Sequence, residues 1–203
     1  MMNFFRRKKK IQGKTKVVVP GYYDQITLGQ FVNYKLAKTD FEKVKAITDK
    51  PDNIVEQLTF EQVRDIIDIF EKLLESPTQL KRDRVVLGGI HYGFHPNMDG
   101  MTLGEHIDAT SNVSDLSKWV KTIAVLYRPI TMTSNNKYRI EDYNVAKHQS
   151  KENLKRLEQM PMHYVNGLHT FFLTIQNELQ TSLELSSIQT LRKTIEEAIN
   201  PAD

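Results

Sequence analysis

The segment 88–100 holds the densest group of side chains able to do chemistry in this chain of 203 residues. Four side chains within it or just after it are of types that bind zinc or another divalent cation: His91, His95, Asp99 and Glu105. Two histidines four residues apart converge on one ion when they lie on a helix, but Gly93 and Pro96 favour a strand and a turn here. The pattern therefore favours a bend that glycine permits over a metal site.

Motifs of the common enzyme classes are absent from the sequence. It has no Gly-x-Ser-x-Gly elbow, no His-Glu-x-x-His helix, and no glycine pattern of a dinucleotide-binding fold or a P-loop. His163 and His169 are six positions apart on a predicted helix, so they fall on different faces and fit core or surface histidines better than a catalytic pair. The lack of cysteine excludes disulfides, thiolate metal sites and a cysteine nucleophile. We therefore predict no catalytic residue, no resident metal and no cofactor.

A nine-residue motif occurs twice, 75 positions apart: residues 24–32 read DQITLGQFV and residues 99–107 read DGMTLGEHI. In each copy a threonine stands at an expected helix N-cap, and a Gln or Glu three positions later can complete a capping box. The predicted cap residues are Thr27, Gln30, Thr102 and Glu105. Each copy follows an extended-looking run, so the motif predicts two similar strand-to-helix entries. Two related halves, about 17–80 and 81–203, and a recurring local cap are both compatible with it.

Apolar spacing predicts a mainly helical chain. Beyond the helix capped by Thr27, the expected helices follow Thr39 or Asp40, Thr59, Ser114, Ser150 and Pro161, with a last one around 188–199. Strands are expected at 17–19, 84–92 and 137–140. The predicted fold class is α+β, mainly α with a small, mostly antiparallel β-sheet. One compact helical body, residues 17–203, follows a flexible basic arm, residues 1–16.

The helix after Ser114 carries Trp119 on its apolar face, which predicts that this single tryptophan lies in the core. Pro129 is expected to end that helix, so Arg128 is interpreted as a cation at the helix carboxyl end that interacts with the helix dipole. Recognition of a carboxylate or phosphate on a partner is the alternative for Arg128.

Charge is unevenly distributed along the chain. Of the 28 lysines and arginines, seven lie in residues 1–16, which hold no acidic residue, so the rest of the chain has 21 basic and 25 acidic side chains. The arm residues are Arg6, Arg7, Lys8, Lys9, Lys10, Lys14 and Lys16. Their mutual repulsion predicts a mobile segment that neutralises DNA phosphates, lies on anionic lipid or docks on an acidic protein surface. No window approaches the ~20 apolar residues of a membrane-spanning helix.

Four segments in this order resemble a family of small proteins encoded among the structural genes of tailed phages of gut Bacteroidetes, including crAss-like phages. The segments are Ile26–Phe31, Met101–Glu105, Ile123–Ile130 and Pro161–Phe172, and the resemblance covers most of residues 22–180. It implies a place in the virion or its assembly pathway: a portal, tail or baseplate component, an internal cargo protein, or an assembly chaperone. It supplies no catalytic residue, and the basic arm lies outside it.

The leading hypothesis is a non-enzymatic virion component, either portal- or tail-associated or internal cargo, that docks on other phage structural proteins. Its arm, residues 1–16, is expected to contact DNA or an acidic protein surface. The expected location is the virion, or the host cytoplasm during assembly, and an oligomer or ring is compatible with the sequence. The alternatives are a transient head or tail assembly chaperone absent from mature particles, a metal-dependent enzyme built on the segment 88–105, and a direct nucleic-acid-binding protein.

Overall fold

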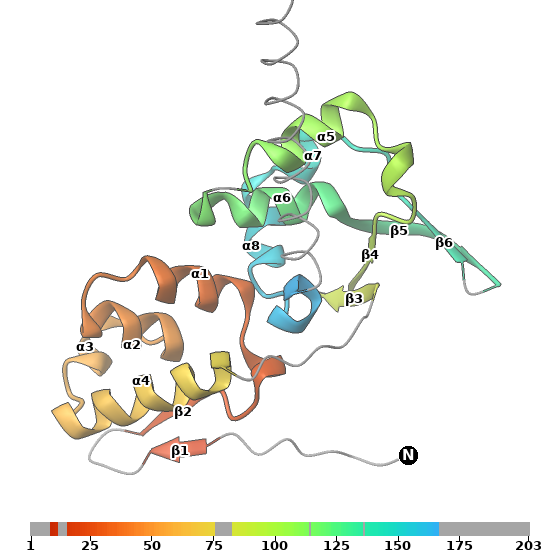
Figure 1. Ribbon diagram of the computed structural model, residues 1–203. Helices are drawn as coiled ribbons and strands as arrows, with labels where there is room; N and C mark the ends of the chain where they lie inside the picture. The colour runs from red at the N-terminus through yellow and green to blue at the C-terminus, as the bar shows by residue number, and fades with distance from the viewer. Residues whose placement is uncertain (1–8, 12–15, 76–82, 114, 136, 167–203) are drawn as a thin grey trace, which may run out of the picture. The chain divides into compact units, whose positions relative to one another are not determined.

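The computed structural model describes residues 9–11, 16–75, 83–113, 115–135 and 137–166. The chain divides into two units, Met1–Gly167 and Leu168–Asp203, and all described residues belong to the first (Figure 1). This unit is α+β, as predicted, with a four-stranded antiparallel sheet among its helices. The predicted helix around 188–199, and the part of the preceding helix from Leu168 onward, lie outside the described residues.

A two-stranded antiparallel ribbon opens the described chain. It consists of β1 (Lys9–Ile11) and β2 (Val17–Val19), with Lys10 opposite Val18. Val17 and Val19 are buried and Val18 is exposed, so β2 shows the alternation of a strand with one face on the core. Because β1 lies inside the predicted arm, residues 9–11 are paired rather than free, and the folded chain starts before Val17.

A group of helices follows the ribbon (Figure 1). The 3-10 helix η1 (Tyr23–Gln25) leads to α1 (Leu28–Leu36), α2 (Asp40–Thr48), α3 (Asp52–Val55) and α4 (Phe60–Glu75). Capping boxes begin three of the helices, at Thr27, Thr39 and Thr59, and the sequence predicts a helix start at each of these places. The helix α2 contacts both α1 and α4. The Tyr34 and Phe70 rings, from α1 and α4, meet with their centroids 4.8 Å apart.

The second group of elements contains the sheet, whose strands are β3 (Arg84–Leu87), β4 (Ile90–Phe94), β5 (Tyr127–Ser134) and β6 (Lys137–Ile140) in the order β3-β4-β5-β6. Gly88 and Gly89 form the β3–β4 turn with φ of 55° and 80°, a left-handed conformation that glycine adopts without strain. The helical elements are η2 (Met98–Gly100), α5 (Leu103–Thr110), η3 (Leu116–Lys118), α6 (Trp119–Leu126), α7 (Val145–His148) and α8 (Lys151–Leu157). Residues 162–166 are also helical.

The end of α6 differs from the prediction. The helix stops at Leu126, and residues 127–129 pair with β4 as the start of β5. Arg128 precedes a proline, which disfavours the helical conformation and favours an extended one. The interpretation of Arg128 as a helix-end cation is therefore wrong, because it is a buried residue of a strand. Trp119 is half-buried rather than fully buried, and its ring stacks on Phe31 with centroids 6.0 Å apart.

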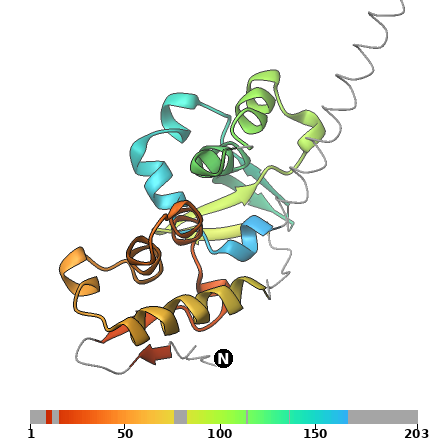
Figure 2. The same ribbon diagram turned by 60° about the vertical axis from the view of Figure 1, so that its left-hand side comes forward.

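The segment 158–162 joins the two groups of elements by binding the start of α1. The Leu28 and Gly29 N–H groups donate to the carbonyls of Met160 and Glu158 at 2.8 and 2.9 Å, and the Met162 N–H donates to the Ile26 carbonyl at 2.8 Å. Figure 2 shows the first turn of α1 beside the chain that follows α8. Backbone groups at a helix start that have no partner within the helix are thus satisfied by the turn that follows α8.

The repeated motif has the same local structure in both copies. The strands β1 and β3, the 3-10 helices η1 and η2, and the helices α1 and α5 each begin 75 positions apart. Thr27 and Thr102 are extended N-cap residues, with φ/ψ of −90°/158° and −68°/157°, and both hold complete capping boxes. The copies diverge afterwards, since α2 leads to further helices whereas α6 leads into β5.

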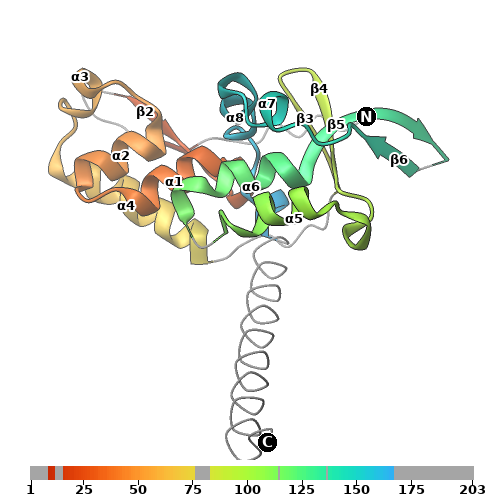
Figure 3. The ribbon, with the colours of Figure 1, turned by 90° about the horizontal axis from the view of Figure 1, so that it is seen from above.

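The hairpin of β5 and β6 extends past the other strands (Figure 3). Only residues 127–129 of β5 pair with β4, and the rest of β5 pairs with β6 alone. No helix within the described ranges combines the length and the apolarity needed to cross a bilayer.

Candidate functional site

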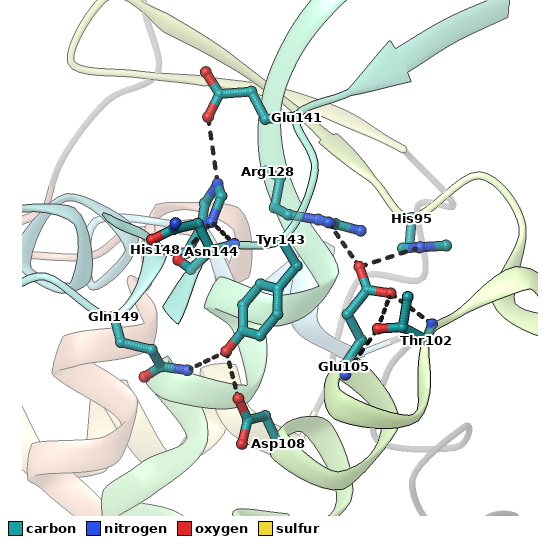
Figure 4. A network of polar contacts seen from close by, with 10 residues as sticks. All are labelled: His95, Thr102, Glu105, Asp108, Arg128, Glu141, Tyr143, Asn144, His148 and Gln149. Atoms are coloured by element: carbon teal, nitrogen blue, oxygen red, sulfur yellow. Dashed lines mark hydrogen bonds and ion pairs between the residues drawn. The ribbon is translucent and has the colours of Figure 1, made fainter. Parts of the chain in front are cut away.

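A polar network with a buried centre links α5, β5, α7 and the loops beside them (Figure 4). We call it the Glu105 network, and its members are His95, Thr102, Glu105, Asp108, Arg128, Glu141, Tyr143, Asn144, His148 and Gln149. Two of the four predicted cap residues, Thr102 and Glu105, lie in it. The other two, Thr27 and Gln30, cap α1 and lie outside it.

Glu105 is the centre of the network. One carboxylate oxygen, Oε2, accepts hydrogen bonds from the Thr102 N–H at 2.7 Å and the Thr102 hydroxyl at 2.9 Å. The other, Oε1, lies 2.7 Å from Nη1 of Arg128. Burial by itself raises the pKa of Glu105, but the Thr102 hydrogen bonds and the Arg128 charge outweigh it and hold the pKa below its ordinary value. Glu105 is therefore an anion at neutral pH.

Arg128 supplies the positive charge. Its side chain is 3% exposed and that of Glu105 6%, so this ion pair is removed from solvent. The guanidinium also lies over the Tyr143 ring, 5.9 Å from the centroid. Burial lowers the pKa of Arg128 and the Glu105 carboxylate opposes that shift. Substitution of either member of such a pair lowers the stability of the fold, because the remaining charge would stay buried without its counter-ion.

His95 lies at the edge of the ion pair, with Nε2 4.0 Å from Oε1 of Glu105. Burial and the nearby Arg128 charge lower its pKa, so the imidazole is neutral at neutral pH. His91 is exposed on β4 and the Asp99 side chain lies outside the described part of the structure. Within that part no cluster of three or more His, Asp or Glu side chains is arranged to hold a metal ion.

The second half of the network surrounds Tyr143, whose hydroxyl donates to Asp108 at 2.8 Å and accepts from Gln149 Nε2 at 3.2 Å. Its ring stacks on His148, with centroids 5.7 Å apart. Nδ1 of His148 lies 3.0 Å from both the N–H and the carbonyl oxygen of Asn144, and Nε2 lies 3.4 Å from Oε2 of Glu141. Burial lowers the pKa of His148.

The network is suited to holding elements together. The Glu105 carboxylate caps α5 and binds a residue of β5 at the same time. The first copy of the motif uses its equivalent residue similarly, because Gln30 completes a capping box and donates from Nε2 to the carbonyl of Ile47, near the end of α2, at 2.7 Å. Gln30 thus connects the start of α1 with the last turn of α2, and Glu105 connects the start of α5 with a residue just after α6. Since both oxygens of Glu105 are already bonded, the geometry favours a structural role over proton transfer.

The other sequence-predicted residues lie apart from the network. Lys9 and Lys10 belong to β1 and Lys16 is exposed, whereas Arg6, Arg7, Lys8 and Lys14 lie outside the described residues. His163 is buried in the helical residues 162–166, its ring 4.3 Å from that of Tyr164. Its predicted counterpart His169 lies outside the described residues.

Sequence reasoning missed Arg128, Tyr143 and His148 as members of one site. A signal for Arg128 was present, because a strand predicted at 137–140 after the turn Ser134-Asn135-Asn136 needs a partner strand before the turn. Asn135 does adopt the left-handed turn conformation, with φ of 47°. Tyr143 and His148 carry no local signal, since their contacts depend on how the chain folds back onto α5.

No family model, curated protein or solved structure matches the chain. The inferences that follow therefore rest on its own residues and geometry, together with the resemblance described above.

Proposed function

We propose that this protein is a non-enzymatic component of a tailed-phage virion, a portal- or tail-associated structural protein or an internal cargo protein, that docks on other virion proteins. Its basic arm, residues 1–16, contacts DNA or an acidic protein surface. The observation that supports the proposal is how the four segments that resemble the phage family contact one another in the fold. In the described residues each of these segments is bound to another of the four.

Three contacts connect these segments. The first and fourth meet through the hydrogen bond from Met162 N–H to the Ile26 carbonyl. The second and third meet through the Glu105–Arg128 ion pair. The third and fourth meet where the Tyr127 hydroxyl, 3.4 Å from the Tyr164 carbonyl, donates to it. The distinctive residues thus serve the fold, which supports a scaffold that acts through its surface.

The surface offers apolar side chains to partners. Phe60 at the start of α4 is 94% exposed, Leu103 on α5 is 77% exposed, and Met132 on the β5–β6 hairpin is 58% exposed. A partner that covers any of these side chains would remove apolar area from solvent, which favours association.

Quantitative mass spectrometry of purified virions beside infected-cell lysate, normalised to the major capsid protein, tests the proposal. A fixed copy number in the particles is expected. Abundance in the lysate with absence from the particles would overturn the virion assignment and support the alternative of a transient assembly chaperone.

The role of the arm is tested separately, with substitutions that leave β1 intact. The test variant replaces Arg6, Arg7 and Lys8 with alanine. The matched control removes three exposed lysines from the body: Lys50, Lys121 and Lys155. If the arm contacts DNA, the test variant should bind duplex DNA more weakly, and the slope of log affinity against log salt concentration should become shallower by about 3. An equal effect of the control variant would show that the contact is not specific to the arm.

A further inference from the structure

The two copies of the repeated motif differ in what covers them. In the first copy, the segment 158–162 lies against the start of α1, where Leu28 is 0% exposed and Val32 6% exposed. The backbone of this segment comes so close that a Cβ on Gly29 would lie 3.1 Å from Cβ of Glu158 and 3.2 Å from its carbonyl oxygen. Glycine at this position is therefore explained by the covering segment.

The equivalent surface of the second copy is open. Leu103, which corresponds to Leu28, is 77% exposed, and Ile107, which corresponds to Val32, is 52% exposed. A Cβ on Gly104, the counterpart of Gly29, would meet no atom within 4 Å. No packing within the described chain therefore requires glycine at this position.

The backbone groups of this surface are also equivalent. The capping box uses the N–H groups of Thr102 and Glu105 and leaves those of Leu103 and Gly104 directed away from the helix. In the first copy the corresponding two N–H groups bind the carbonyls of Glu158 and Met160, in the turn that follows α8. Within the described chain no backbone carbonyl binds the N–H of Leu103 or Gly104.

We propose that the first turn of α5, with Leu103, Gly104 and Ile107, is a docking site for a turn segment of a partner protein. The covered copy defines the chemistry of that segment. It carries apolar side chains on either side of a proline, as in Met160-Pro161-Met162, and presents two carbonyls to the Leu103 and Gly104 amides. This inference does not depend on the protein being a virion component.

The absence of cysteine from the chain permits a direct test of whether the site is open. In the full chain a Leu103→Cys variant should react with a thiol reagent within about threefold of a His106→Cys variant, which lies exposed on the same helix. Strong protection of the Leu103→Cys thiol would mean that another part of this chain, such as residues 168–203, or a second copy already covers the site. Such protection, from either cause, would overturn the proposal.

Binding is tested with a fluorescent peptide of the sequence of residues 155–164, capped at both ends, added to the full chain and followed by anisotropy. Gly104→Gln should reduce its affinity at least about tenfold, because the new side chain occupies the space that the peptide backbone needs and removes two hydrogen bonds. His106→Gln introduces the same residue on the same helix and should leave the affinity unchanged.

Protection of the Leu103→Cys thiol by the same peptide provides a second readout that needs no variant at Gly104. Saturable binding that Gly104→Gln abolishes, together with thiol protection, would support the site. Absence of saturable binding would refute it, as would equal affinity for the Gly104→Gln variant, which would show that the peptide binds elsewhere, for example by displacing its own sequence from α1.

Discussion

Replacing Glu105 with glutamine removes one charge from the centre of the polar network while keeping nearly the same shape. The amide oxygen of the new side chain can still accept from Thr102, as Gln30 accepts from Thr27 in the first copy, so the capping of α5 is preserved. What is lost is the 2.7 Å ion pair with Arg128, whose guanidinium then remains buried without a counter-ion.

The expected cost follows from this geometry. Breaking a buried ion pair by removing one partner costs about 3–5 kcal/mol, and we take about 3 kcal/mol as the minimum because the glutamine NH2 group then faces the Arg128 guanidinium, donor against donor. For a chain of this length about 3 kcal/mol corresponds to a fall in Tm of roughly 6–12 °C. Urea denaturation followed by circular dichroism would measure the free energy of unfolding.

A matched control is available in α2. Glu42 occupies the same third position of a capping box, accepting from the Lys38 and Thr39 N–H groups, but it is exposed. Glu42→Gln should therefore change the free energy of unfolding by less than about 0.5 kcal/mol. If Glu105→Gln costs no more than Glu42→Gln, the burial and pairing of the network are not what stabilises this part of the fold.

The double variant Glu105→Gln/Arg128→Met separates pairing from general damage. Each single substitution should be costly because it leaves one buried charge, whereas the double variant leaves none. We expect it to be more stable than the sum of the single effects by at least about 2 kcal/mol. Additive single effects would refute a direct interaction between the two side chains.

Two further predictions concern the sheet and the pH dependence of stability. A Cβ on Gly93 would overlap the ring of Tyr138, reaching within 2.7 Å of its Cδ2, so Gly93→Ala should destabilise the fold by about 2 kcal/mol in thermal denaturation. Gly104→Ala, which meets no atom within 4 Å, should cause no loss, and equal effects of the two variants would contradict this packing. The pKa values of half-buried His95 and buried His148 lie below the ordinary value, so the unfolded chain binds protons first as the pH falls. The free energy of unfolding should therefore decrease from about pH 7 to pH 5.5, and urea titrations showing constant or rising stability over that range would contradict the assignment.

Local signals in the sequence predicted much of the fold. The capping boxes at Thr27 and Thr102 form as their spacing indicates, because the interaction spans only three residues. The strands at 17–19 and 137–140 and the helix after Thr59 also lie where expected. These elements depend on nearest neighbours and on apolar periodicity, which a sequence displays directly.

Contacts between distant segments could not be predicted in the same way. The roles of Glu105 beyond its cap and of Arg128 depend on β5 lying beside α5, and the predicted helix was carried past the point where β5 begins. Likewise, Leu28 and Leu103 occupy equivalent positions in the same motif, yet one is buried and the other exposed. Residues 158–162, more than 100 positions from Leu28, bind the backbone of the first copy, and no described segment binds the second copy in the same way.

Lysine-directed cross-linking of intact virions followed by mass spectrometry tests the central proposal, docking on other virion proteins, most directly. We predict reproducible cross-links from this chain, including its exposed Lys16, to defined positions on another structural protein, with a fixed number of copies in each particle. Purified particles that contain no copies of the chain, or that yield cross-links only within it, would contradict the proposal.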